Sequence, residues 1–494
     1  MLPLASAAPS DSTKQACREI ADRLPQGRVA YPLELPYIAE TQRYWSVALR
    51  ELRPACIVSP QCAEHVAAAV QVLSGHADVP FTVKSGGHDP NPGHSSIDDG
   101  VLIAMHEMVG ATYDAKTGHA LVKPAGEWND VIGALEPHGV TVVGGRLGIV
   151  GVGGLLLQGG LSFLSAQYGL AADSIVGWET VMPNGTIVNV DAKAQPDLAV
   201  AMKGSGSQFG IVTQFTIEAH PIGQVWGGYR LYDASQKDAL FAALHQFIPN
   251  NADDPKTAVI FSDLVTAANI PAVLMFYFHE GPEEPTSGPI RPFLDIPTLG
   301  GISSVTKTQS YAQLLKGNGD FSSAVQARDS FRTFTIPHVP NNPGLYDEIS
   351  KKWHDITSAY LITHPTSQCS VDFQPLPRVV GSRTKARGGN AMGLTGSDPH
   401  RIVLEFQCGW LLKPDDAIVY ALARDMTDWL QGRLPDWLAQ AGLDSGAYMP
   451  LFMNDAAGDQ NVTGSYRDHA KFKKLQESID PMGVFAKRVG GYKY

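Results

Sequence analysis

The chain has 494 residues, of which 44% are hydrophobic and 18% charged, and its formal net charge is −11. This composition is typical of a soluble globular protein, and the length favours two domains or two lobes. The acidic balance argues against nucleic acid and anionic membranes as partners. The sequence also lacks an apolar run of about 18 residues that would predict a membrane span.

The first residues predict the remains of a secretion signal. Ala5-Ser6-Ala7 is the small-x-small pattern found before a cleavage point, although no basic start precedes it and the apolar core is short. The alternative is a disordered cytosolic N-terminus. The sequons at Asn184 and Asn461 fit secretion but also arise by chance. The five cysteines leave at least one free thiol, and because no pair has zinc-ligand spacing we expect no metal site.

The first half of the chain alternates predicted helices and strands. Apolar residues at helical spacing predict helices at residues 14–25, 61–73, 128–138 and 197–202. Apolar and β-branched runs predict strands at residues 55–58, 81–83, 101–105, 119–122, 174–182, 186–190 and 211–219. This alternation favours an α+β lobe that holds a nucleotide.

A second lobe is predicted to begin after Pro221-Ile222-Gly223. Its expected strands lie at residues 227–232, 259–264, 272–279, 369–374 and 402–410, and its helices at 310–315, 342–362 and 415–430. This order predicts a sheet backed by helices, a usual architecture for a substrate lobe. The basic segment 377–389 is predicted to be a solvated loop rather than an anion site.

The first motif with chemical content follows the strand predicted at residues 81–83. It is Ser85-Gly86-Gly87-His88, and Pro90 and Pro92 stiffen the loop after it. Paired glycines let the backbone turn tightly against a ligand, and successive amides form a concave site suited to pyrophosphate. The alternative is a surface turn with an incidental histidine.

A second glycine-rich run spans residues 151–160, with glycines at 151, 153, 154, 159 and 160. This spacing matches neither the Rossmann fingerprint nor a P-loop. It indicates a place where backbone approaches a flat or phosphorylated ligand, or else tight packing between elements.

Several motifs occur together in the order and at the spacing of one family. They are Lys84-Ser85-Gly86-Gly87-His88, Val150-Gly151-Val152-Gly153-Gly154, Tyr168-Gly169-Leu170-Ala171-Ala172-Asp173, the run 204–213, and Asp480-Pro481-Met482-Gly483-Val484-Phe485. This set resembles the berberine-bridge-enzyme-like branch of the FAD-linked oxidases. The resemblance implies an α+β fold with a two-lobed, discontinuous PCMH-type FAD-binding domain at residues 1–222 and 446–494. A substrate domain with an antiparallel sheet backed by helices is expected at 223–445.

The resemblance implies FAD as the cofactor, with a single covalent link. The family bonds the histidine of Ser-Gly-Gly-His, here His88, to the 8α-methyl group of the flavin, which should make the flavin a stronger oxidant. A second link in many members uses a cysteine where this chain has Leu147. Leu155 replaces a histidine that donates to the flavin pyrimidine edge, so another donor, such as a backbone amide, is expected there.

The residues expected to bind FAD are His88, Lys84, Ser85, Gly86, Gly87, His94, Ser95, Gly145, Gly151, Gly153, Gly154, Gly159, Gly210, Ile211, Val212 and Asn454. Two other histidines, His94 in this set and His106 outside it, are expected to have structural roles rather than to carry the covalent link to the flavin.

The resemblance also implies catalytic residues. Glu405 stands amid apolar neighbours, where a carboxylate is costly unless paired or functional, and it matches the family glutamate that takes a proton from substrate. Gln407 shares its face of the strand. Val150 matches the position beside the flavin edge where dioxygen reacts, and a small valine there goes with oxidase behaviour. The alternatives are a salt-bridged structural glutamate and an ordinary buried valine.

Asp455 is an alternative base. The family commonly has Tyr-x-Asn-Tyr in this region, and here Asn454 matches while Phe452 and Asp455 replace the tyrosines. This departure, together with the missing cysteine, argues mildly against carbohydrate oxidation.

The expected activity is that of a FAD-dependent oxidase. It would transfer hydride from a small or medium alcohol, amine or secondary metabolite to the linked flavin, which O2 reoxidises to give H2O2. The alternatives are a flavoprotein cyclase or pericyclase, a dehydrogenase, a carbohydrate oxidase, and a flavin-binding protein with a degenerate site. The chain is expected to be a secreted monomer or weak oligomer. The family often has a disulfide near Cys17 and Cys56, so that bridge is expected.

Overall fold

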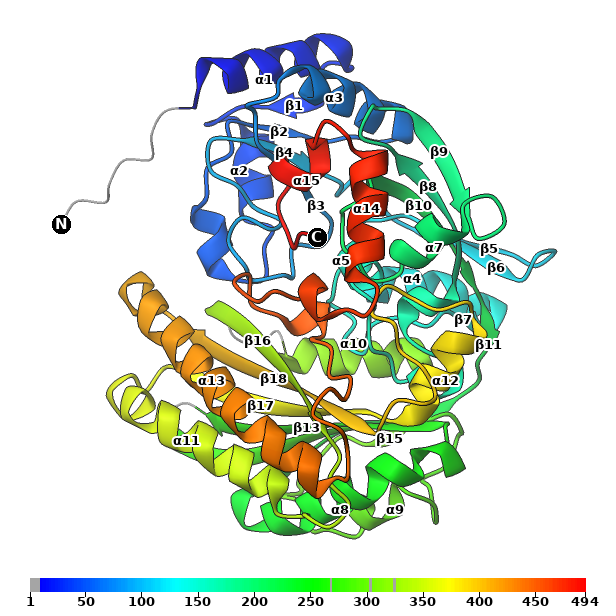
Figure 1. Cartoon of the computed structure of the whole chain (residues 1–494), viewed down its shortest axis with the longest axis vertical. Helices are drawn as coiled ribbons and strands as arrows, with labels where there is room; N and C mark the ends of the chain where they lie inside the picture. Colours follow the sequence, from blue (N-terminus) through cyan, green and yellow to red (C-terminus); the bar gives the residue numbers. More distant parts are fainter. Residues whose placement is uncertain (1–8, 267–268, 302–303, 323–325) are drawn as a thin grey trace.

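The computed structural model describes residues 9–266, 269–301, 304–322 and 326–494. Figure 1 shows an upper part, which contains the blue start and the red end of the chain, above a lower part built around one large sheet. The chain therefore leaves the upper part, builds the lower part and returns. The division of the chain at residues 222 and 445 remains a prediction.

A small sheet near the start of the chain combines parallel and antiparallel pairing. Its strands, in the order in which they pair, are β1 (Val29–Ala30), β2 (Cys56–Val58), β4 (Val101–Ala104) and β3 (Phe81–Lys84). The last three are parallel, and β1 is antiparallel to β2. Helices α1 (Asp11–Arg23) and α3 (Ala63–Gly75) share a hydrophobic core with this sheet. The expected Cys17–Cys56 disulfide is confirmed and ties α1 to β2.

A second sheet of the upper part is antiparallel throughout. Its strands, in pairing order, are β5 (Ala111–Asp114), β6 (His119–Val122), β10 (Ile211–Glu218), β8 (Ile175–Val181) and β9 (Ile187–Asp191). The strands β8 and β9 form the hairpin that the sequence predicts around Asn184-Gly185. Helix α4 (Trp128–Leu135) shares a hydrophobic core with this sheet.

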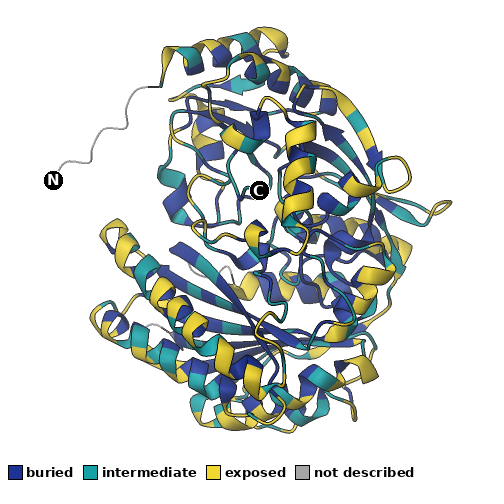
Figure 2. Ribbon diagram, in the orientation of Figure 1, coloured by how far each residue is buried: buried dark blue, intermediate teal, exposed yellow. Residues whose placement is uncertain are grey.

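The lower part is built on a seven-stranded sheet whose neighbouring strands are all antiparallel. Its strands, in pairing order, are β15 (Lys307–Gln309), β12 (Val225–Asp233), β14 (Ile270–His279), β13 (Thr257–Thr266), β17 (Gln368–Leu376), β18 (Arg401–Trp410) and β16 (Arg328–Pro337). Helices α8 (Lys237–Asn250), α11 (Leu345–Thr363) and α13 (Asp416–Gln440) cover one face. Figure 2 shows the exposed sides of α11 and α13 turned away from the sheet.

Alternation along β18 sorts its side chains between the two faces of this sheet. Leu404, Phe406 and Cys408 belong to the core under the helices. Glu405 and Gln407 point to the opposite face, toward the upper part, and line a cavity there. On the helix side, Cys408 forms a disulfide with Cys369 on β17.

Further helices connect these sheets. They are α2 (Leu35–Thr41), α5 (Val152–Leu157), α6 (Ser165–Tyr168), α7 (Pro196–Ala201), α9 (Arg291–Leu294), α10 (Tyr311–Ser322), α12 (Arg378–Ala386), α14 (His469–Ile479) and α15 (Val484–Arg488), beside a short strand pair β7 (Val140–Thr141) and β11 (His220–Pro221). Among the helices of the described ranges, none is both long and apolar enough to cross a membrane.

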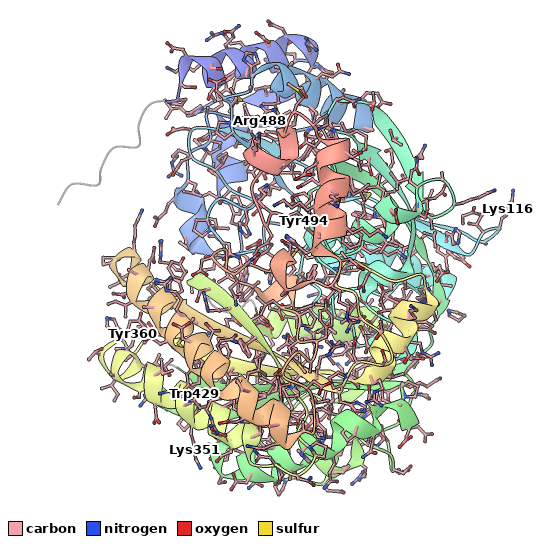
Figure 3. All side chains as sticks on the ribbon, in the orientation of Figure 1. Lys116, Lys351, Tyr360, Trp429, Arg488 and Tyr494 are labelled. Carbon is pink, nitrogen blue, oxygen red and sulfur yellow. A yellow bond between two sulfur atoms is a disulfide. The ribbon has the colours of Figure 1, made fainter. Side chains whose placement is uncertain are left out.

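The end of the chain packs into the upper part. Val484, Phe485 and Val489 join the core of the small sheet, and Arg488 donates to the carbonyls of Leu73 and His76 at 2.7 and 2.6 Å. The Tyr494 hydroxyl shares a hydrogen bond with Ser205. In Figure 3, Arg488 lies close to the blue helices and Tyr494 lies beside the red helix α14. The final segment therefore closes the lobe that the first residues begin.

Several elements differ from the sequence prediction, among them helices α8 and α14, which were not predicted. The segment 377–389, expected as a solvated loop, contains helix α12. The prediction was wrong because it followed the basic residues, whereas Val380 and Thr384 are buried, and the Thr384 hydroxyl donates to Asp173 Oδ2 at 2.6 Å. Sequence reasoning also missed strand β16, whose polar start is paired: Arg328 binds Asp416 on α13 at 2.6 Å.

Candidate active site

A cavity of about 690 Å³ lies between the glycine-rich loops of the upper part and the seven-stranded sheet. Most residues predicted for the cofactor and the chemistry line it. They are Ser85, Gly86, Gly87, His88, His94, Ser95, Val150, Gly151, Gly153, Gly154, Gly210, Ile211, Val212, Glu405, Gln407, Asn454 and Asp455. Residues more than 300 positions apart in sequence therefore share one wall.

Three of the residues predicted to bind the cofactor do not line the cavity wall. Lys84 is buried behind the turn and pairs with Glu40 at 2.8 Å. Gly145 packs against the Trp128 ring, and Gly159 lies near Leu170 and Asn454. Each of the three supports a loop that does line the cavity.

The two glycine-rich loops cross at Gly86 and Gly151. A Cβ atom at Gly86 would lie 2.5 Å from the Cα atom of Gly151, so neither position has room for a side chain. Beside the crossing, the Ser85 hydroxyl donates to Pro124 O at 2.6 Å and accepts from the Gly153 amide at 3.1 Å. The glycines are therefore required for packing between the loops as well as for access to the cavity.

The same loops leave polar groups available to a ligand. Within the described part of the chain, the amides of Gly86, Gly87 and His88 donate to no protein acceptor. The buried Ser95 hydroxyl, which also lines the cavity, has no hydrogen-bond partner. A Cβ atom at Gly154 would meet nothing within 4 Å. Free amides, an unpaired hydroxyl and an open glycine surface fit the pyrophosphate and flat ring of FAD.

The His88 side chain is half-buried and packs beside two aromatic rings. Its ring stacks on Trp45, with centroids 4.4 Å apart and planes at 21°. Phe331 of β16 lies 6.4 Å from it. Burial lowers the pKa of His88 to about 4, so the imidazole is neutral near pH 7 and one ring nitrogen keeps its lone pair.

The neighbouring histidines are paired with carboxylates. His94 Nδ1 lies 2.9 Å from Asp89 Oδ2, and His106 Nδ1 lies 3.0 Å from Glu40 Oε2. Both contacts connect loops around the turn.

A group of carboxyls occupies the sheet side of the cavity. Gln374 of β17 donates from its amide nitrogen to Asp455 Oδ2 at 2.6 Å and to Glu405 Oε2 at 3.4 Å. Asp372 lies directly opposite Glu405 across the β17–β18 pair. Arg146 donates from Nη2 to the side-chain Oε1 of Gln374. One glutamine therefore connects a guanidinium to two carboxyls.

Burial shifts the titration of this group. It raises the pKa of Asp455 to about 6 and that of Asp372 to about 7. Burial, reinforced by Asp455 and Asp372, raises the pKa of Glu405 well above its ordinary value. Three carboxyls face a single arginine, so near neutral pH the group retains at least one carboxyl proton.

Sequence reasoning missed Arg146, Gln374 and Asp372. Arg146 is carried by the loop before Gly151, and helix α10 of the lower part holds that loop: the Gly148 amide donates to Leu315 O at 2.9 Å. Nothing local distinguishes these residues, because their partners come from other strands. The alternation along β17 that puts Asp372 and Gln374 on one face could have indicated them once Glu405 was chosen.

The rest of the cavity wall is largely apolar. Val150 lines it from the loop, and Leu231, Ile260, Leu264, Leu274 and Phe276 line it from the sheet. Asp329 of β16 also lines the cavity, and it is only 6% exposed. Burial raises the pKa of Asp329 to about 8. An organic substrate with a polar reacting group suits such a surface.

Comparisons with known proteins agree with this geometry. A family model described as "FAD binding domain" matches residues 54–191, which include both glycine-rich loops. The chain is 35% identical over 95% of its length, and over 93% of the relative, to an uncharacterized FAD-linked oxidoreductase of Arthroderma benhamiae. The chain belongs to the same family of FAD-linked oxidoreductases.

A further relative supports the family, and a solved structure supports the fold. A FAD-dependent monooxygenase of Aspergillus calidoustus is 30% identical over 98% of this chain and 91% of the relative. The solved structure of the Physcomitrella patens BBE-like 1 protein superposes with a TM-score of 0.72 over 96% of this chain and 97% of that one, at 20% identity. This FAD-linked oxidoreductase therefore has the PCMH-type fold expected from its motifs.

Proposed function

We propose that this FAD-linked oxidoreductase is an oxidase that takes hydride from a small or medium alcohol, amine or secondary metabolite. The observation that carries the proposal is the shared cavity, in which the Gly-Gly-His turn and the carboxyl pair Glu405 and Asp455 line one space. A hydride acceptor and a proton acceptor must reach adjacent atoms of one substrate, its carbon and its hydroxyl or amine group, and this arrangement allows that.

The turn and the glycine-rich loop would hold FAD, with one covalent link through His88. When bound, FAD supplies a two-electron acceptor that O2 can reoxidise to give H2O2. The neutral imidazole of His88 has the free lone pair that bond formation needs. Leu147 stands in the cavity wall and cannot form a second link, which supports a single attachment.

The proposed bases are Glu405 and Asp455, which act as a pair. Gln374 holds one oxygen of each carboxyl, so a proton on one member favours ionisation of the other. The ionised member accepts the proton of the substrate hydroxyl or amine as hydride leaves carbon. Arg146, fixed to Gln374, stabilises the ionised carboxylate before it accepts that proton. Gln407, two residues along β18, would orient the substrate.

A monooxygenase is the second candidate, because the Aspergillus calidoustus relative carries that name. Val150 in the cavity wall supports reaction with O2 in either case. A dehydrogenase, a cyclase or pericyclase, and a carbohydrate oxidase are further alternatives. The apolar wall around Leu274 and Phe276 suits a ring system better than a sugar.

Oxygen uptake during a substrate screen tests the proposal. Catalase added after an oxidase reaction returns half of the consumed O2, because two H2O2 give one O2. A monooxygenase returns none and incorporates ¹⁸O from ¹⁸O2 into its product. A dehydrogenase consumes no O2 but reduces dichlorophenolindophenol, and a cyclase turns over without O2. Glu405→Gln should lose the uptake, whereas Glu283→Gln, at an exposed surface position, should keep it.

We further propose that the protein is secreted. The support is the pair of disulfides, Cys17–Cys56 and Cys369–Cys408, which persist in oxidising compartments. Cys62 is the cysteine left as a free thiol in the described residues. Thiol counting on protein from the culture medium, before and after reduction, tests both points. A monomer or weak oligomer is expected by size exclusion.

A further inference from the structure

The segment that ends at Trp45 packs behind the Gly-Gly-His turn. The Trp45 amide donates to Gly87 O at 3.0 Å, and its indole covers the His88 ring at 4.4 Å. A Cβ atom at Gly87 would lie 2.9 Å from Arg43 O, so the turn and the segment touch backbone to backbone. Phe331 lies 5.2 Å from the indole and extends the aromatic surface.

A buried ion pair anchors this segment to strand β3. Lys84 Nζ donates to Glu40 O at 3.1 Å and to Glu40 Oε1 at 2.8 Å. Its ammonium also lies 3.8 Å from the centroid of the Tyr44 ring. Lys84 and Glu40 are 1% and 2% exposed. A buried pair of this kind is costly to break, because loss of either partner leaves the other charge uncompensated.

Tyr44 holds the segment from the other side. Its carbonyl accepts from Arg50 Nε at 3.0 Å and from Arg50 Nη2 at 2.6 Å. Its hydroxyl donates to Ser95 O at 2.8 Å, in the loop that follows the turn. The backbone of Trp45 is therefore fixed to both sides of His88, and the indole has little freedom to leave the imidazole.

We propose that Trp45 is the positioning residue for covalent attachment of the flavin, because its indole sets the plane of the His88 ring. The proposal rests on the proposed link at His88. Attachment forms one bond from a ring nitrogen to the 8α-carbon and breaks one methyl C–H bond and the imidazole N–H bond. The two electrons pass through the flavin ring to O2, which takes up the two protons as H2O2.

The orientation of the imidazole controls this step. A lone pair forms a bond only when it is directed at the carbon, and a displacement of about 1 Å costs on the order of 10²-fold in rate. Without the indole the His88 ring can rotate. We therefore expect Trp45→Leu to attach flavin about 10²-fold more slowly, and Trp45→Phe, which keeps a flat ring, to show a smaller defect.

The test measures attachment rather than turnover. Protein produced in a riboflavin-starved host is mixed with FAD, and the flavin that stays with the acid precipitate is followed over time. Total bound flavin before acid treatment and Tm are recorded in parallel. The matched control is Trp429→Leu, which removes an indole from helix α13 on the outside of the lower part (Figure 3).

The expected result is slow attachment in Trp45→Leu with total bound flavin and Tm close to those of Trp429→Leu. Attachment at the wild-type rate would overturn the proposal, as would a defect that merely follows lost binding or a lower Tm. If Trp45→Leu is insoluble, Trp45→Met repeats the test without a flat ring. Release of all flavin from the wild-type precipitate would instead refute the His88 link itself.

Discussion

Substitution of Gly86 by alanine tests the loop crossing on which the cofactor site depends. The new Cβ atom would lie 2.5 Å from Gly151 Cα and 3.1 Å from Gly151 N. Carbon atoms in ordinary contact are about 3.5–4.0 Å apart, so the two loops must separate by about 1 Å. Both obstructing atoms belong to the backbone, so no side chain can rotate away.

Overpacking of this kind costs about 1–3 kcal/mol, and backbone contacts put this case at the upper end. We expect Tm to fall by several degrees. The separation also moves the free amides at Gly87 and His88 away from the Gly153 loop, so FAD binding should weaken. Each 1.4 kcal/mol of lost binding free energy weakens FAD binding about tenfold. Flavin absorbance relative to protein absorbance, with differential scanning fluorimetry, measures both effects.

The matched control is Gly133→Ala in helix α4. A Cβ atom at Gly133 would meet nothing within 4 Å. Alanine is the better helix residue by about 0.5–1 kcal/mol, so this variant should keep its flavin and gain slightly in Tm. If Gly86→Ala keeps the wild-type flavin ratio and Tm, the argument from the crossing is refuted.

Three further predictions follow from buried groups. Glu405→Gln should slow anaerobic flavin reduction by substrate about 10²–10⁴-fold in stopped flow, with flavin content unchanged. Asp329 has a pKa of about 8 in the folded state because it is buried. The folded protein therefore holds an extra proton between about pH 4 and pH 8, and this residue's contribution to stability falls as pH rises through that window. Asp329→Asn should stabilise by up to about 4 kcal/mol at pH 7 and by almost nothing at pH 4, measured by thermal melts. Replacing Cys369 and Cys408 by serine opens a loop with a sequence separation of 39 and should cost about 4 kcal/mol of unfolding free energy, read from denaturant midpoints.

Each of these has an outcome that contradicts it. Unchanged flavin reduction in Glu405→Gln would leave Asp455 as the base. A stabilisation by Asp329→Asn that is equal at pH 4 and pH 7 would show that the carboxyl proton is not the cause. If reduction of the wild-type protein leaves the denaturant midpoint unchanged, the Cys369–Cys408 disulfide does not stabilise the fold. Cys62→Ser serves as the control for loss of a cysteine side chain.

The motifs of the cofactor site could be predicted from the sequence because they are local. Glycines at 86 and 87 act through their own missing side chains, and the order of motifs along the chain indicates the family. Two-residue alternation placed Glu405 and Gln407 on one face of a strand, and in the structure both line the cavity. These properties depend on neighbours in the chain rather than on the fold.

The cluster of carboxyl side chains in the cavity could not be predicted from the sequence, because it forms only in the tertiary structure. Arg146, Gln374 and Asp455 meet only because a loop of the upper part, a strand of the lower part and the returning chain face one cavity. Lys84 carried a family motif, yet the structure turns it away from the cavity to pair with Glu40.

The two disulfides show the same difference between what the sequence predicts and what the tertiary structure decides. Both join cysteines with a sequence separation of 39. The family pattern predicts Cys17–Cys56, whereas Cys369 and Cys408 become partners through the register of β17 on β18. Residue type and local spacing thus determined the cofactor class and the turn that would carry it. The direction of each side chain, and with it the pKa of each buried group, was decided by which strands pair and which faces are covered, since burial and neighbouring charge arise only in the folded chain.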